Sequence, residues 1–172
     1  GADIGLSNGG GIRTDIQPGS ITYNDTLAVF PFGNMGCVIE ATGQKIKDAL
    51  EMGARDYPEE CGGFLQVSGL TYTIDTSVKT SVKLDDKGNF ISVDGPYRVK
   101  DIMVNGGPID LNRTYTVASH NYMLKSGGDG MTMFNGCSVI KDDVMVDVDV
   151  LSSYIRSLGG AVTADYADPL GQ

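Results

Sequence analysis

The sequence predicts an α+β fold, a single compact domain with a mixed β-sheet and two main helices. Two segments show the apolar spacing of helices and five or six show strand character, and the two kinds do not alternate as in a doubly wound sheet. A candidate hairpin in the second half indicates antiparallel pairing. Glycine supplies 24 of the 172 residues, about twice its usual share, so we expect many tight turns.

The first half of the chain is expected to hold two strands and one helix. Residues Ile21–Leu27 form a weak strand candidate and Cys37–Ala41 a stronger one. Thr42 follows as a helix N-cap, because its hydroxyl can accept a hydrogen bond from the first helical turn. From Gln44 to Ala54, apolar residues recur every three or four positions, as on the buried face of a helix. Pro58 then prevents any extension of this helix.

The middle of the chain is expected to form strands. In Leu70–Ile74, apolar and polar residues alternate, which is typical of a half-buried strand. Residues Arg98–Val104 and Thr114–Ala118 are interpreted as the two strands of a hairpin with a long loop. The chain enters that loop at the turn residues Asn105-Gly106-Gly107.

The last predicted element is a helix that Asp147 caps and that runs to Leu158. Its expected buried stripe is Val148, Leu151, Ile155 and Leu158. Gly159-Gly160 should end it, because glycine readily adopts the left-handed conformation after a helix. We therefore assign residues 1–160 to the domain and residues 161–172, which have no periodicity, to a C-terminal tail.

Composition excludes several classes of partner. The formal net charge is −9 at pH 7, and lysine and arginine form no cluster, so neither a nucleic acid nor an anionic membrane surface is an expected partner. No apolar run approaches the ~18 residues of a membrane span, so we expect no direct membrane insertion. The three cysteines, Cys37, Cys61 and Cys137, are too few and odd in number for a disulfide framework. We expect all three cysteines to be small buried residues. The sequence does not exclude the alternative of one disulfide bridge and one free thiol.

The sequence offers little for catalysis on its own. It has one histidine, His120, and no HxH, HExxH or calcium-loop pattern, so we expect no metal site and no catalytic residue in this chain. Ser119 and His120 are neighbours in a predicted strand and so point to opposite faces, which prevents a nucleophile–base pair. The simpler interpretation is a histidine at a strand end, with its ring at the surface or hydrogen-bonded. Dinucleotide-binding and P-loop glycine motifs are also missing from the sequence.

Three glycine-containing segments favour a recognition surface instead. In the first, residues 8–13, Asn8 and Arg13 bracket three glycines, a bare turn that a ligand could approach closely. In the other two, Phe32 lies in Pro31-Phe32-Gly33-Asn34, and Tyr122 precedes the loop Gly127-Gly128-Asp129-Gly130. Neither ring belongs to a periodic apolar stripe. Two rings on facing loops could stack on a nucleobase. The alternative interpretation is that each ring packs in the hydrophobic core.

In order and spacing, these three segments resemble the C-terminal domain of the 5'-nucleotidase family, from about Asn8 to about Leu158. The resemblance implies that Phe32 and Tyr122 clamp the base, although the family usually has Phe at the second position. It implies that Asn8 hydrogen-bonds the base.

The same resemblance assigns the sugar end of the ligand. Arg13 would lie near the ribose and phosphate, and Asp129 would accept hydrogen bonds from ribose hydroxyls, although an ordinary Asx-turn is the alternative for Asp129. Gly10 and Gly33 would shape the pocket walls. Residues 62–69 also resemble a family segment, which we interpret as scaffold.

The resemblance further implies that hydrolysis belongs to an N-terminal metallophosphatase domain of the same polypeptide, with a divalent metal pair such as Zn or Mn. This chain needs no cofactor and should be inactive alone. Its partners would be a nucleotide or nucleoside and that upstream domain, and its location extracellular, periplasmic or on the cell surface. One alternative is the same domain in a 2',3'-cyclic phosphodiesterase, a UDP-sugar hydrolase or a sulfur-compound hydrolase. The aromatic pair disfavours the sulfur-compound hydrolase, whose substrate has no base to stack. The other alternative is a non-enzymatic nucleoside-binding or adhesion module.

Overall fold

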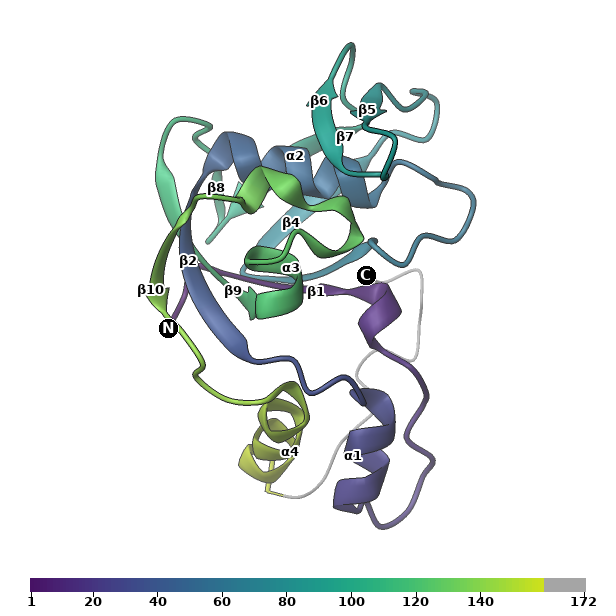
Figure 1. The fold of residues 1–172 in the computed structure, drawn as a ribbon, viewed down its shortest axis with the longest axis vertical. Coiled ribbons are helices and arrows are strands. Elements are labelled where there is room, and N and C mark those ends of the chain that lie inside the picture. Colours follow the sequence, from purple (N-terminus) through teal and green to yellow (C-terminus); the bar gives the residue numbers. More distant parts are fainter. Residues whose placement is uncertain (160–172) are drawn as a thin grey trace.

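The structure, a computed structural model, describes residues 1–159 and is built on one five-stranded sheet (Figure 1). The strand order is β10-β2-β9-β1-β3. The strands are β1 (Ile4–Asn8), β2 (Gly36–Thr42), β3 (Leu65–Ser68), β9 (Thr114–His120) and β10 (Ser138–Lys141). β1 and β9 run parallel, whereas the other neighbouring strands are antiparallel. The predicted α+β fold with a mixed sheet is therefore confirmed.

Two smaller sheets lie outside this main sheet. One contains β4 (Leu70–Ile74), β7 (Val99–Val104) and β8 (Gly107–Pro108), and the other is the hairpin of β5 (Val82–Leu84) and β6 (Phe90–Val93). In Figure 1 this hairpin projects at the upper end of the molecule.

The predicted long hairpin between Arg98–Val104 and Thr114–Ala118 is wrong. Asn105 and Gly106 have φ angles of 51° and 81°, a tight two-residue turn that folds β7 directly onto β8. The chain then crosses to the main sheet, where β9 pairs with β2 along its whole length. Both segments are strands, but they belong to different sheets.

The first helix, α1 (Tyr23–Val29), lies where the sequence predicted a weak strand over Ile21–Leu27, and that prediction is wrong. A capping box explains the helix. Thr22 Oγ1 accepts a hydrogen bond from the backbone N–H of Asp25, and the Asp25 carboxylate accepts one from the backbone N–H of Thr22 at 2.7 Å. The two contacts satisfy donors that a helix start otherwise leaves free.

The two main helices, α2 (Gly43–Gly53) and α4 (Asp147–Ser157), have 11 residues each and confirm the prediction. Thr42 caps α2 as predicted by accepting from the backbone N–H of Lys45. α4 packs against α1 below the sheet in Figure 1, where the Thr26 and Ser152 hydroxyls are 2.9 Å apart.

The prediction for α4 needs two corrections. Val146, not Asp147, occupies the N-cap position, and Asp147 is the first helical residue. Leu158 is 43% exposed and does not belong to a buried stripe, whereas Val148 and Ser152 are buried. Both buried residues lie in the first two turns of the helix, and residues 156–158 at its end are exposed. Gly159, with φ of 76°, ends the helix, while Gly160 and the predicted tail 161–172 lie outside the described residues.

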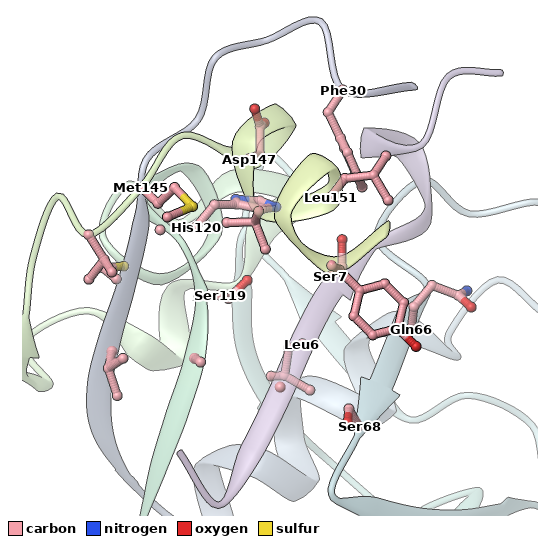
Figure 2. A pocket seen from close by; sticks show the side chains of 18 of the residues that line it. Leu6, Ser7, Phe30, Gln66, Ser68, Ser119, His120, Met145, Asp147 and Leu151 are labelled. Atoms are coloured by element: carbon pink, nitrogen blue, oxygen red, sulfur yellow. The ribbon is translucent and has the colours of Figure 1, made fainter. Parts of the chain in front are cut away.

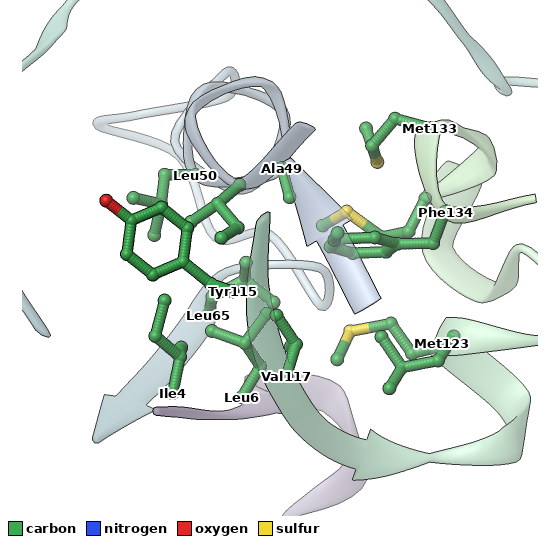
Figure 3. Close-up of a cluster of buried hydrophobic side chains, with 14 of the residues drawn as sticks. Ile4, Leu6, Ala49, Leu50, Leu65, Tyr115, Val117, Met123, Met133 and Phe134 are labelled. Carbon is green, nitrogen blue, oxygen red and sulfur yellow. The ribbon is translucent and has the colours of Figure 1, made fainter. Parts of the chain in front are cut away.

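The main core fills the space between one face of the sheet and α2, with α3 (Asn121–Leu124) and the turn Thr132–Phe134 at its side (Figure 3). Leu50 from α2 meets Ile4, Leu65 and Val117 from three strands. At the end of α2 the buried Glu51 carboxylate accepts the backbone N–H groups of Arg98 and Val99, at 3.1 and 2.9 Å, which ties the helix to β7.

The expectation that the cysteines are buried is confirmed for Cys37 only. Cys61 and Cys137 are half-buried, and all three are free thiols. Within residues 1–159, no helix is both long and apolar enough to cross a membrane.

Candidate functional site

The glycine turn Gly9–Gly11 follows directly from the end of β1. Residues 62–64 brace it, because the backbone N–H of Gly9 donates to the Phe64 carbonyl and that of Gly10 to the Gly62 carbonyl, both at 2.8 Å. A Cβ at Gly10 would lie 3.1 Å from the Cα of Gly62, so glycine permits this close approach of two backbones. The segment interpreted as scaffold thus holds the turn directly.

Asn8 lies beneath this turn and is only 5% exposed. Its Nδ2 donates a 2.6 Å hydrogen bond to Asp129 Oδ2, and its Oδ1 is 3.0 Å from His120 Nε2. Gly11 covers the same amide, since a Cβ there would be 2.8 Å from Asn8 Oδ1. Each end of the amide therefore makes one hydrogen bond within the protein, and contact of Asn8 with a ligand stays a prediction.

Asp129 and Tyr122 form the second part of the site. Asp129 adopts a left-handed backbone conformation with φ of 53°, in the turn Gly128–Gly130. The Tyr122 hydroxyl donates to Asp129 Oδ1 and accepts from the Asp129 backbone N–H, both at 3.3 Å. The ring lies so close to Gly128 that any Cβ there would collide with it. Tyr122 is nevertheless 41% exposed, so it is held in place without being buried.

Phe32 and Arg13 form the third part. The Phe32 ring is 59% exposed, and the Arg13 guanidinium carbon lies 5.9 Å from its centroid, a cation–π distance. Arg13 Nη1 also donates to the Gly10 carbonyl at 2.9 Å. Gly33, with φ of 65°, forms the turn after the ring.

The start of α4 anchors the Phe32 loop. Asp147 Oδ2 accepts from the backbone N–H of Asn34 at 3.1 Å, and the backbone N–H of Asp147 donates to the Asn34 carbonyl at 2.9 Å. Next to this pair, Asn121 Oδ1 accepts from the backbone N–H of Met35 at 3.1 Å and so ties the loop to α3. The sequence predicted only a helix N-cap role for Asp147.

The seven predicted binding residues thus fall into two connected groups. Asn8, Tyr122 and Asp129 share one hydrogen-bond network. In the other group Arg13 bonds to Gly10 and lies at a cation–π distance from Phe32, with Gly33 beside the ring. The turn at residues 9–11 and the Asn121–Met35 contact join the groups. Both rings are exposed, so core packing does not account for either of them.

His120 is the residue whose place in the site the sequence did not predict. It ends β9, is 9% exposed and contacts Asn8, so of the two interpretations the hydrogen-bonded one is correct. Burial lowers the pKa of the imidazole below its usual value, although the nearby Asp147 and Asp129 carboxylates act in the opposite direction.

Two cavities flank these residues. One, of about 500 Å³, lies beside the glycine turn. It is lined by Gly9, Gly10, Ile12, Arg13, Gly53, Tyr57, Glu59, Glu60, Cys61, Gly62 and Phe64. The other, of about 550 Å³, lies between α4 and the face of the sheet that α2 does not cover (Figure 2), with Ser7, Ser119 and His120 on its sheet side and Met145 and Leu151 opposite. Phe32 and Tyr122 line neither of these two cavities.

Metal ligands do not gather anywhere in residues 1–159, since no group of three or more His, Cys, Asp or Glu side chains is placed to hold an ion. The site combines two exposed rings, an exposed guanidinium and a carboxylate held by two neighbours.

Comparison with known proteins places this chain in a family. A family model described as the 5'-nucleotidase C-terminal domain matches residues 1–136. The trifunctional nucleotide phosphoesterase YfkN of Bacillus subtilis is 34% identical over 165 residues, which are 95% of this chain and 10% of that protein. A 5'-nucleotidase of Vibrio parahaemolyticus is 32% identical over 171 residues, 99% of this chain and 26% of the relative.

A solved structure agrees with these matches. The 5'-nucleotidase precursor from Thermus thermophilus superposes with a TM-score of 0.76 at 34% identity, over 91% of this chain and 29% of that one. The chain spans about a quarter or less of the length of the two curated relatives.

Proposed function

Since the chain belongs to the 5'-nucleotidase family, whose C-terminal domain it matches, we propose that it is the substrate-recognition domain of a nucleotide phosphohydrolase. The observation that carries this proposal is the pair of exposed rings, Phe32 and Tyr122, each held on a glycine-containing loop beside a charged group. The base of a nucleotide or nucleoside stacks between these rings, and the sugar and phosphate contact Asp129 and Arg13.

The two rings are suited to stacking because both are exposed while contacts with neighbouring residues hold them in place. Tyr122 rests against Gly128 and bonds to Asp129, and the Phe32 loop is tied to α4 and α3. Ordering the rings before the ligand arrives lowers the entropic cost of binding. Stacking contributes roughly 1–3 kcal/mol per base and tolerates different bases.

The charged residues suit the sugar end of the ligand. Asp129 accepts one hydrogen bond at each oxygen, from Asn8 and from Tyr122, and a carboxylate has about four acceptor positions. The remaining positions accept from ribose hydroxyls. Arg13 uses one donor on the Gly10 carbonyl and keeps the others for a phosphate. Asn8 acts here by holding Asp129, and Gly10 and Gly33 shape the turns.

We assign hydrolysis to an N-terminal metallophosphatase domain of the same polypeptide that holds a divalent metal pair, such as Zn or Mn, outside this chain. Those ions would activate water and bind the phosphate. Such an enzyme would work in the periplasm, at the cell surface or outside the cell. Phosphate release from AMP by the purified chain, with added Mn²⁺ or Zn²⁺, tests the assignment, and turnover above contamination level would refute it.

Binding itself is tested by titration calorimetry with adenosine, AMP and UMP. Phe32→Ala should weaken all three ligands by about 5- to 100-fold, the range that a lost stacking contact implies. Tyr23→Ala is the matched control, because Tyr23 is 49% exposed at the start of α1 and lines neither cavity. Equal affinity of wild type and Phe32→Ala would remove Phe32 from the site.

A broader substrate range is the second candidate. The relative YfkN is described as a trifunctional nucleotide phosphoesterase, and ring stacking does not depend on where the phosphate is attached. The same domain could therefore serve a 2',3'-cyclic phosphodiesterase or a UDP-sugar hydrolase. Titration with 2',3'-cyclic AMP and UDP-glucose separates these from a strict 5'-nucleotidase.

A further inference from the structure

We infer that His120 is a positioning residue of the binding site. Its Nε2–H group fixes the amide of Asn8, which in turn fixes the carboxylate of Asp129 for the sugar hydroxyls of the ligand. The hydrogen-bond relay stands on the geometry alone, whereas its consequence for the ligand rests on the proposed function.

The direction of each hydrogen bond follows from Asp129. An ionised carboxylate only accepts, so the Asn8 atom 2.6 Å from Asp129 Oδ2 must be the amide nitrogen. The amide oxygen then faces His120 Nε2 at 3.0 Å. An oxygen in that place requires a donor, so Nε2 must carry the proton.

The other ring nitrogen indicates a neutral imidazole. Nδ1 is buried and has no hydrogen-bond partner among residues 1–159, and a buried donor without an acceptor is costly. The groups that face the ring are the Asp147 and Asp129 carboxylates and Tyr122, whose ring centroid is 6.1 Å away. The two carboxylates favour the charged form, but burial outweighs them and lowers the pKa. His120 therefore acts as the neutral Nε2–H tautomer.

The fold places His120 for this role. β9 and β1 are parallel neighbours, so His120 and Asn8, at their final residues, meet at the same edge of the sheet. With 9% exposure His120 lies behind the site, and Figure 2 shows its side chain on the side of the sheet that faces Met145 and Asp147. Its hydrogen-bonded path to the ligand runs through Asn8 and Asp129.

Loss of the Nε2–H donor would leave Asn8 Oδ1 without its partner and hold the amide at one end only. The amide would then be less ordered, and so would the Asp129 carboxylate that it holds. Hydrogen bonds to the sugar would weaken most, whereas stacking on the base would change less, because Gly128 also holds the Tyr122 ring. The expected signature is a loss of selectivity for ribose, not a general loss of binding.

The tautomer can be measured directly because His120 is the only histidine in the sequence. A long-range ¹H–¹⁵N correlation spectrum of the labelled chain at pH 7 gives one histidine pattern that needs no assignment. We expect the neutral Nε2–H tautomer without any ligand. An Nδ1–H tautomer at this pH, which carries no proton on Nε2, would overturn the relay, whatever the chain binds.

The role in binding is tested by the ratio of the affinities for adenosine and 2',3'-dideoxyadenosine. His120→Leu should lower this ratio about 10-fold, in the range expected of hydrogen bonds to charged groups, with a smaller change in the dideoxynucleoside affinity. His120→Gln keeps an N–H donor and should retain the ratio within about 2-fold.

Circular dichroism establishes that both variants fold. An equal ratio in all three proteins, or an equal fall in both variants, would overturn the positioning role. A wild-type chain that binds neither nucleoside would overturn the proposed function and the effect on the ligand, while the tautomer spectrum still decides the relay.

Discussion

The side-chain amide of Asn8 donates a 2.6 Å hydrogen bond to the carboxylate of Asp129, across 121 residues of sequence. This contact joins the end of β1 to the turn after α3. The glycine turn with Arg13 and the turn with Asp129 and Tyr122 are therefore parts of one structure, so a change at either residue should affect both halves of the site.

Asn8→Asp should destabilise the chain by about 1–3 kcal/mol at pH 8, because it replaces a buried donor with a second carboxylate beside Asp129. Two adjacent carboxylates raise the pKa of one of them in the folded state. That group then favours folding at low pH and loses its effect as the pH rises, so the variant should recover near pH 4–5. Urea unfolding at both pH values measures this, with the exposed Asn112→Asp as control. A deficit that does not depend on pH would contradict it.

Gly128→Ala should weaken nucleotide binding with little loss of stability. The new Cβ would collide with the Tyr122 ring, so the ring must move away from the place that stacking requires. Gly5→Ala is the matched control, since its Cβ would meet Ser68 at an ordinary 3.5 Å. Calorimetry with AMP and thermal melts compare the two, and an unchanged AMP affinity in Gly128→Ala would exclude Tyr122 from the site.

Local signals predicted the two main helices well. Periodic apolar residues and the Thr42 cap defined α2, and the start of α4 was off by one position. α1 was mistaken for a strand because only Thr26 and Val29 are buried, too few to show a helical period. The Thr22–Asp25 capping box was the signal that could have revealed it.

Long-range pairing could not be predicted in the same way. The strands around Asn105 were identified, but nothing local specifies that β9 pairs with β2 instead of β7. The same limit applies to the site. The seven residues that motif order predicts for it stay a prediction, whereas the burial of Asn8 and its contact with His120, 112 residues away, arise only in the folded chain.

Asp147→Ala should weaken binding through Phe32, although Asp147 does not contact the ring. Its carboxylate holds the backbone N–H of Asn34, and without it the Phe32 loop would be less ordered and stacking would cost more entropy. We expect a fall of about 3- to 10-fold in AMP affinity, the worth of one lost hydrogen bond. Asp149→Ala, in the same helical turn, is the control. If both variants bind AMP with wild-type affinity, the contact between Asp147 and Asn34 does not contribute to AMP binding.

Asp75→Asn should destabilise the chain at pH 6 but not near pH 2. A 2.6 Å hydrogen bond from Lys100 and further bonds from Ser77 lower the pKa of Asp75 to about 2. The unfolded chain has the ordinary value of about 3.9. Because the folded pKa is depressed, the charged carboxylate stabilises the fold above about pH 4, and this effect is lost as the pH falls towards 2.

The difference in urea midpoint between wild type and Asp75→Asn should therefore be largest at pH 6 and shrink as the solution is acidified. Asparagine keeps an oxygen for the Ser77 bonds, so the variant removes mainly the charge. Asp86→Asn, at an exposed carboxylate, is the control for a general charge effect. A difference that stays constant from pH 6 to pH 2 would mean that the charge on Asp75 contributes nothing, and that its turn with Ser77 stabilises this part of the chain without help from Lys100.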